Sequence, residues 1–142
     1  MLKIKDLLTN KGHAVWSVAP DDTVYDAIAL MSEKGIGALC VVHEEKLIGI
    51  ISERDYARSI ILQGRRSRET PVKEIMTGQP ITITPEHKVD ECLSIMTEKR
   101  IRHLPVIQNG YLVGVVSIGD LVKTIIQEQS QLITQLEHYI KS

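Results

Sequence analysis

The sequence contains few of the residues that mark specialised classes of protein. Its 142 residues include no Phe and one Trp, and aromatic residues make up 4%. A platform that stacks the bases of single-stranded nucleic acid needs more rings than this. The formal net charge of -1 gives no bulk attraction to nucleic acid or to an anionic membrane surface. We therefore expect neither of these partners.

The cysteines and histidines lack the spacing of a metal or redox site. Cys40 and Cys92 stand alone within apolar patterns, so we expect each to be a small buried hydrophobe. The five histidines contain neither an HxxxH nor an HExxH pair. There is also no Ser-His-Asp order, thiol–base pair or Walker-type phosphate loop. We expect no dedicated metal site and no enzymatic activity.

The chain also lacks a long apolar run. Its first residues, MLKIKDLLTN, carry charges too early for a signal peptide, and no apolar stretch reaches the roughly 20 residues of a membrane span. The apolar share of 43% and the charged share of 25% are ordinary for a globular chain. We expect a cytoplasmic protein with one compact domain, or with two small halves that share a core.

What the sequence does contain is an internal repeat. The phrase GIISERDYA, residues 49–57, returns as GVVSIGDLV, residues 114–122. Both have a glycine, two apolar residues, Ser, two variable residues and Asp. Residues 20–56 align without a gap to residues 85–121, at a constant separation of 65. The same phrase therefore closes two copies of one unit.

A shorter match precedes each copy. IKDLLTN, residues 4–10, corresponds to VKEIMTG, residues 72–78, at a separation of 68, so the first copy has three extra residues near Lys11, Gly12 and His13. The repeat divides the chain into a first copy with an N-terminal helix, a polar linker, a second copy and a helical extension, at residues 1–62, 63–71, 72–125 and 126–142.

Each copy has the pattern of a β-α-β-β-α unit. A short strand at residues 15–18 or 80–83 leads into a helix whose apolar residues recur at positions i, i+3, i+4 and i+7. Two strands follow, joined by the hairpin-like connectors HEEK and QNG, and a second helix begins at each Ser-x-x-Asp. We predict an α+β fold in which two repeats pack about a pseudo-two-fold axis and leave two related clefts.

The Ser52-x-x-Asp55 junction is first of all a helix-capping box. That box prefers Glu or Gln at its last position, whereas both copies have the shorter Asp. A strand-to-helix junction also presents free backbone N–H groups that suit an anion, and an Asp one turn later can accept two ribose hydroxyls. The two interpretations are compatible, because a capped helix start also presents these N–H groups.

The cations near the two junctions differ. Arg54 and Arg58 lie beside Asp55 in the first copy, whereas Arg102 and His103 belong to the second copy. Guanidinium groups bind phosphate in a bidentate manner, although Arg54 and Arg58 could equally form a solvated helix face. We expect two unequal clefts, with different ligands, one long ligand that spans both, or one idle cleft.

The duplicated unit with its two Ser-x-x-Asp junctions resembles a tandem pair of CBS domains, a Bateman module. The resemblance covers about residues 1–125 and includes the strands IGALCVV and IRHLPVI and the segment IMTGQPITITP. The phrase SERDYAR is similar to small stand-alone bacterial and organellar members. Such modules bind adenosine-containing ligands (AMP, ADP, ATP, NAD(H) or S-adenosylmethionine) and transmit their presence to a partner protein. The resemblance implies a non-enzymatic sensor.

The resemblance also implies roles for particular residues. Ribose hydroxyls would be held by Asp55 and Asp120, one in each cleft, and ribose or phosphate would be contacted by Ser52 and Ser117. The adenine would be walled by the strand starts at Ile36, Gly37, Ala38, Leu39, Ile101, Arg102, His103, Leu104 and Pro105. The segments that close the clefts include Val15, Ser17, Ile81 and Thr82. Phosphates would be neutralised by Arg54, Arg58, Arg102 and His103.

An apolar stripe continues past Asp120 to the C-terminus, at Leu121, Ile125, Leu132, Leu136 and Tyr139, flanked by Val122, Ile126, Ile133 and Ile140. This is more apolar surface than a small domain needs, and spacings of three and four residues suit a partner helix. We expect self-association into a homodimer, with a tail folded back on its own domain as the alternative. A rival hypothesis for the whole chain is a structural homodimerisation module with non-functional clefts.

Overall fold

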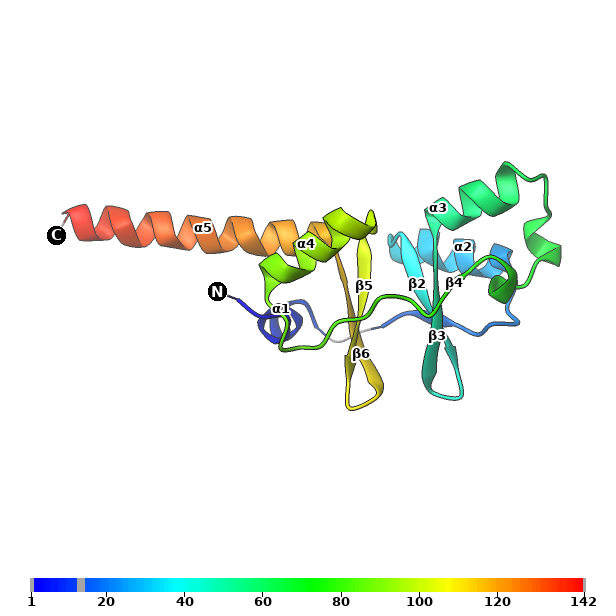
Figure 1. Cartoon of the computed structure of the whole chain (residues 1–142). Coiled ribbons are helices and arrows are strands. Elements are labelled where there is room, and N and C mark those ends of the chain that lie inside the picture. The colour runs from blue at the N-terminus through cyan, green and yellow to red at the C-terminus, as the bar shows by residue number, and fades with distance from the viewer. Residues whose placement is uncertain (1, 13–14, 142) are drawn as a thin grey trace.

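A pair of long antiparallel strands lies at the centre of each half of the molecule, and the two halves stand side by side (Figure 1). The computed structural model describes residues 2–12 and 15–141. The first half contains β1 (Ser17–Val18), α2 (Val24–Lys34), β2 (Ala38–His43), β3 (Lys46–Ser52) and α3 (Glu53–Tyr56), which continues as a π-helical segment at Ala57–Ile61. The second half contains α4 (Val89–Lys99), β5 (His103–Gln108), β6 (Tyr111–Ser117) and α5 (Ile118–Lys141), and the segment before it carries β4 (Thr77–Gly78), which joins the sheet of the first half.

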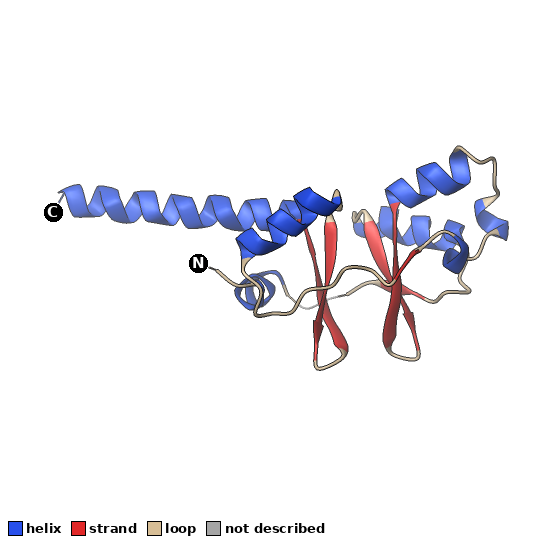
Figure 2. Ribbon diagram, viewed as in Figure 1, coloured by secondary structure: helices blue, strands red, loops and turns tan. Residues whose placement is uncertain are grey.

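The predicted α+β class is confirmed, and the helices lie mainly at one end of the strands (Figure 2). A further helix, α1 (Ile4–Lys11), precedes the first half, and short 3-10 turns occupy Ser67–Glu69 and Val72–Glu74. The strand predicted at residues 80–83 is reduced to a parallel bridge between Ile83 and Val106. None of the helices in the described ranges is long and apolar enough to cross a membrane.

The sheet order brings each strand start beside the matching strand-to-helix junction. In the first half the strands lie in the order β1-β2-β3-β4, and Ala38 at the start of β2 pairs with Ser52 at the end of β3. In the second half β5 and β6 form an antiparallel pair in which His103 lies opposite Ser117. Strands β3 and β6 contact each other across the boundary between the halves.

Each half is completed by the segment that precedes the other half. Helix α1 runs beside the second half, and the backbone N–H of Lys5 donates to the carbonyl oxygen of Pro85 at 2.9 Å (Figure 1). The segment before the second half repeats this contact, because the N–H of Lys73 donates to the carbonyl oxygen of Pro20 at 3.0 Å. The chain therefore crosses between the halves twice, in an exchange that follows the repeat.

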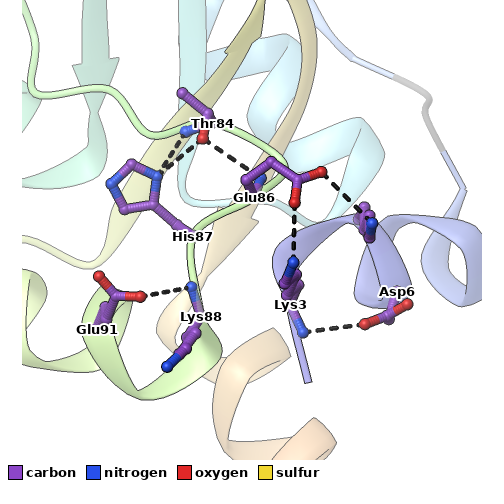
Figure 3. A network of polar contacts seen from close by, with 8 residues as sticks. Lys3, Asp6, Thr84, Glu86, His87, Lys88 and Glu91 are labelled. Atoms are coloured by element: carbon purple, nitrogen blue, oxygen red, sulfur yellow. Dashed lines mark hydrogen bonds and ion pairs between the residues drawn. The ribbon is translucent and has the colours of Figure 1, made fainter. Parts of the chain in front are cut away.

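Ion pairs accompany both crossings. Lys3, the N-cap of α1, places its Nζ atom 3.0 Å from Glu86 Oε2 (Figure 3). Lys5 Nζ lies 3.4 Å from the other carboxylate oxygen of Glu86. At the other crossing Lys73 Nζ lies 2.8 Å from Asp21 Oδ1. These ion pairs hold the pKa of Glu86 and that of Asp21 below their ordinary values. All of these groups are on the surface, so the ion pairs add orientation more than stability.

Two hydrophobic cores result, one in each half. The first half buries residues of α2, β2 and β3 together with Val72 and Ile75 from the exchanged segment. The second half buries residues of α4, β5 and β6 together with α1, through Ile4, Leu7 and Leu8. The exchange thus supplies apolar side chains to both cores.

The predicted burial of the two cysteines is confirmed. Cys40 and Cys92 are free thiols with exposed fractions of 1% and 0%. Burial raises the pKa of Cys40 to about 12. Burial, with the charges of Glu91 and Asp90, raises the pKa of Cys92 to about 11. Both thiols therefore stay protonated at neutral pH and act as small apolar groups.

The glycines of the repeated phrase are required by the exchange. A Cβ atom at Gly114 would lie 2.7 Å from Leu8 Cδ2 of α1, and one at Gly49 would lie 2.9 Å from the carbonyl oxygen of Thr77. Both distances are shorter than ordinary van der Waals contact. Each glycine therefore allows the segment from the other side of the molecule to approach its strand.

We predict that Gly114→Ala destabilises the protein by about 1–3 kcal/mol, because the added methyl group forces Leu8 and α1 away from β6. Urea denaturation measures the free energy of unfolding. Gly119→Ala is the matched control, since its Cβ would meet only Ser117 Oγ at 3.7 Å. Equal stability of the two variants would contradict the proposed role of Gly114.

Candidate functional site

The first Ser-x-x-Asp junction has the geometry of a helix cap. Ser52 Oγ accepts a hydrogen bond from the backbone N–H of Asp55 at 3.2 Å. In return, Asp55 Oδ2 accepts from the Ser52 N–H at 2.9 Å and from the Ser52 hydroxyl at 3.0 Å. Within residues 2–12 and 15–141, Asp55 Oδ1 accepts no hydrogen bond. One carboxylate oxygen therefore holds the cap, and the other is available to a ligand.

A cleft of about 370 Å³ opens beside this junction, between the two halves. Such a volume falls within the range of small-molecule sites, roughly 300–1,000 Å³. The first half contributes the start of β2, residue 50 of β3 and the junction itself. The second half contributes its leading segment and the start of β5. The lining residues are Gly37, Ala38, Ile50, Ser52, Glu53, Arg54, Asp55, Arg58, Thr77, Gln79, Pro80, Ile81, Arg100, Ile101, Arg102 and His103.

The cleft brings together ten of the residues that the sequence analysis named, and it places two of them with the other copy's junction. Arg102 and His103 were expected in the second cleft, but they line the same cleft as Asp55. His103 lies close to the strand start of the first half, since a Cβ atom at Gly37 would lie 3.5 Å from His103 Cε1. The physical reason is that β3 faces β6, so the strand start of one half meets the junction of the other.

The other predicted residues lie outside this lining. Leu39 and Leu104 are 1% and 0% exposed and belong to the two cores, because side chains alternate along a strand. Pro105 is buried, Ile36 and Val15 are half-buried, and Ser17 and Thr82 are exposed. Ser117 and Asp120 form the second junction. A ligand contact by any of these residues stays a prediction.

The lining carries an excess of positive charge. Four arginines, at positions 54, 58, 100 and 102, face two carboxylates, those of Glu53 and Asp55. Arg54 Nη1 donates to the carbonyl oxygen of Arg100 at 3.2 Å, which joins the two halves at the cleft. The guanidinium groups of Arg58, Arg100 and Arg102 form no ion pair within the described part of the chain. These three groups can therefore receive an anion.

His103 differs in charge from its arginine neighbours. Burial lowers its pKa below the ordinary value of 6.5, with nearby Asp120 acting in the opposite direction and Lys11 in the same direction. The imidazole is therefore mainly neutral at pH 7. It can donate or accept a hydrogen bond at the cleft, although the family resemblance implied a cation that neutralises phosphate.

Arg100 is a lining residue that the sequence analysis did not select. It caps the C-terminus of α4 in the left-handed conformation, with φ of 56° and ψ of 44°. The first half has Gly35 at the equivalent place, with φ of 65°. A side chain in this conformation costs roughly 1–2 kcal/mol relative to the right-handed region. The signal was present in the repeat alignment, where an arginine replaces a capping glycine.

The other lining residues that the sequence did not indicate are Ile50, Glu53, Thr77, Gln79 and Pro80. Gln79 also has a positive φ, of 49°. Backbone strain of this kind concentrates at binding sites. The local sequence around these residues does not mark them as binding residues. They line the cleft only because the two halves face each other.

The second junction is built in the same way but has a different neighbour. Asp120 Oδ2 accepts from the Ser117 N–H at 2.9 Å, and Ser117 Oγ accepts from the Asp120 N–H at 3.1 Å. Lys11 Nζ lies 2.6 Å from the same Asp120 oxygen. Burial acts to raise the pKa of Asp120, but hydrogen bonds from Lys11 and Ser117 outweigh it and lower the pKa. This carboxylate is therefore already paired with a cation.

Comparisons with known proteins agree with this architecture. The family model of the CBS domain matches residues 4–62 and 72–127. The chain is 44% identical to the Arabidopsis thaliana "CBS domain-containing protein CBSX3, mitochondrial" over 148 residues, which cover 97% of this chain and 71% of the relative. A crystal structure of the CBS domain NE2398 is 44% identical and superimposes with a TM-score of 0.84, over 87% of this chain and 97% of that one.

A more distant structure shares the fold. It is the CBS domain pair of protein MJ0100 in complex with 5-methylthioadenosine and S-adenosyl-L-methionine. It is 24% identical to this chain, with a TM-score of 0.79 over 90% of this chain and 98% of that one.

We predict that Arg100→Gly stabilises the protein by about 1 kcal/mol, because glycine adopts the left-handed cap without strain. Thermal and urea denaturation both measure this change. Lys99→Gly is the control, since residue 99 is helical and glycine there costs about 0.5–1 kcal/mol. An Arg100→Gly variant less stable than the parent would show that the left-handed backbone is not a source of strain.

Proposed function

Because the chain belongs to the CBS-domain family, we propose that it is a non-enzymatic regulatory module that binds an adenosine-containing ligand between its two halves. A regulated partner protein, whose identity is unknown, would sense the bound state. The observation that carries this proposal is the cleft at Asp55, lined by a carboxylate oxygen that accepts no hydrogen bond from the described residues and by three arginines that form no ion pair with them. A ribose and a phosphate need these two kinds of group.

The junction suits a ribose. A carboxylate oxygen accepts hydroxyl donors, and Asp55 is held in one orientation by its bonds to Ser52. Because the cap fixes the side chain before any ligand arrives, little rotamer entropy is lost on binding. The cap and the binding site are thus one structure, with Oδ2 turned to the backbone and Oδ1 left for the ligand.

The rest of the cleft suits a phosphate and a base. The planar forks of Arg58, Arg100 and Arg102 match phosphate oxygens. Small residues at Gly37 and Ala38 and the apolar edges of residues 80, 81 and 101 leave room for a flat ring with aliphatic walls. The adenosine ligands of the MJ0100 domain pair support the same ligand class here. AMP, ATP and NAD(H) are the candidates.

A ligand in this cleft would contact both halves, which suits a sensor. Residues of the first half would hold the ribose, and Arg100 and Arg102 of the second half would hold the phosphate. A ligand shifts a conformational equilibrium only by its differential affinity for the two states. Contact with both halves supplies such a difference, because it favours the relative position in which both sets of residues reach the ligand.

We also propose a cytoplasmic location, although one relative carries the word mitochondrial in its name.

We predict that titration calorimetry with AMP, ATP, NAD and S-adenosylmethionine finds at least one dissociation constant at or below about 100 μM. Asp55→Ala should weaken that binding at least about tenfold, since a hydrogen bond to a charged group contributes roughly 1.5–3 kcal/mol. Asp26→Ala, on the exposed face of α2, is the matched control. Failure of all four ligands to bind, or equal binding by both variants, would exclude this function.

A second candidate function rests on α5. This helix runs well beyond its own half (Figure 1), and its apolar residues are more than half exposed at Ile126, Leu132, Ile133, Leu136, Tyr139 and Ile140. The isoleucines at 126, 133 and 140 recur every seven residues, the spacing typical of a coiled coil. We propose that two copies associate through this face. Homodimerisation is compatible with ligand binding, and it would be the main function if the clefts are inactive.

Removal of residues 124–142 should convert the dimer into a monomer, as measured by size-exclusion chromatography with light scattering. Ile133→Lys should do the same in the full chain, because a charge at the centre of an apolar contact is left desolvated. Gln127→Lys, on the polar side of α5, should leave the dimer intact. A dimer that survives both the truncation and Ile133→Lys would place the contact elsewhere.

A further inference from the structure

The repeat alignment equates Lys11 with a residue of the open cleft. Residues 4–10 match residues 72–78 at a separation of 68, and the same separation pairs Lys11 with Gln79. Gln79 lines the cleft at Asp55 and carries no charge. The two halves therefore place a neutral amide beside one junction and an ammonium group beside the other.

The Lys11 ammonium group lies where the first half has ligand-accessible space. Its Nζ atom is 2.6 Å from Asp120 Oδ2 and 2.6 Å from the carbonyl oxygen of Val115. Val115 is the repeat equivalent of Ile50, which lines the open cleft. The ammonium group of Lys11 therefore contacts both Asp120 and β6, whose equivalents in the other half, Asp55 and β3, form walls of the open cleft.

The position of Lys11 is fixed by the fold of its own helix. Lys11 is the last residue of α1, whose Leu8 packs against Gly114 of β6. The backbone N–H of Gly12 donates to the carbonyl oxygen of Leu8 at 2.7 Å, which closes the last turn. The exchanged helix thus delivers the ammonium group to Asp120.

A ribose hydroxyl competes poorly with this arrangement. The side chains of Lys11 and Asp120 are 38% and 26% exposed, so their ion pair is partly withdrawn from water. A hydrogen bond between ionised groups is roughly twice as strong as a neutral one. Lys11 binds Oδ2, the oxygen that also accepts from the Ser117 N–H, and within the described residues Oδ1 accepts no hydrogen bond. Because Lys11 Nζ also bonds the Val115 carbonyl oxygen, it occupies the space between the carboxylate and β6. A ribose that approached Asp120 from the side of β6 would have to displace the ammonium group and would offer only neutral hydroxyls in exchange.

We propose that Lys11 acts as an internal counter-ion that closes the second junction, so that each chain binds one adenosine ligand, at Asp55. This inference rests on the proposed function and identifies which of the two repeats binds ligand. It makes Lys11 a specificity-determining residue that selects between two otherwise similar junctions.

The test is the stoichiometry of binding in Lys11→Gln, which installs the residue of the other half. Titration calorimetry with AMP, ATP, NAD and S-adenosylmethionine should give about one ligand per chain for the wild type and about two for Lys11→Gln. Lys5→Gln, on the same helix, should keep one ligand per chain. Lys11→Gln/Asp120→Ala should return to one, and Lys11→Gln/Asp55→Ala should keep one.

Each outcome bears on a different claim. Two ligands per chain in the wild type would overturn the counter-ion role and leave the proposed function standing. One ligand per chain in a Lys11→Gln protein with an unchanged melting temperature would do the same, because the second junction would then be closed for another reason. Absence of binding in the wild type and in Lys11→Gln would overturn both the inference and the proposed function.

Discussion

The exchange of leading segments between the halves is the constraint on which the rest of the structure depends. Helix α1 completes the core of the second half, and residues 72–78 complete that of the first, so neither half is closed alone. Matching backbone hydrogen bonds from Lys5 and Lys73 fix both crossings. The second crossing continues into residues 79–81, which line the cleft, and the first ends at Lys11. Each junction therefore has a residue of an exchanged segment close to it.

The sequence predicts the local structure, namely the helices, strands and caps, but not the contacts between residues far apart in the chain. The order of elements and the two caps follow from apolar periodicity and from Ser-x-x-Asp, because these patterns act within one turn or one strand. The composition of the cleft depends on how β3 meets β6. An alignment of repeats assigns Arg102 and His103 to a copy and carries no information on which cleft they line. The cleft that these two residues line could not be predicted from the sequence for that reason.

The differences between the copies are more informative than their similarities. At two equivalent pairs of positions one half has a charged residue and the other a neutral one: Arg100 opposite Gly35, and Lys11 opposite Gln79. The first adds a cation to the open cleft at a cost in backbone strain. The second neutralises the carboxylate of the other junction. Both changes separate two similar sites into one that can hold an anionic ligand and one that is internally paired.

The open cleft is also connected to the helix proposed for dimerisation. Arg102 lines the cleft, and its carbonyl oxygen accepts a hydrogen bond at 2.9 Å from the N–H of Ile118, the first residue of α5. Two residues later Asp120 is held by Lys11 of α1. A ligand phosphate that moved Arg102 would therefore act on the start of α5 at a point already fixed to the exchanged helix. Because α5 is a single helix of 24 residues, a small rotation at its start displaces its far end, where the exposed apolar face lies. This hydrogen-bonded turn would couple the proposed ligand site to the proposed dimer face.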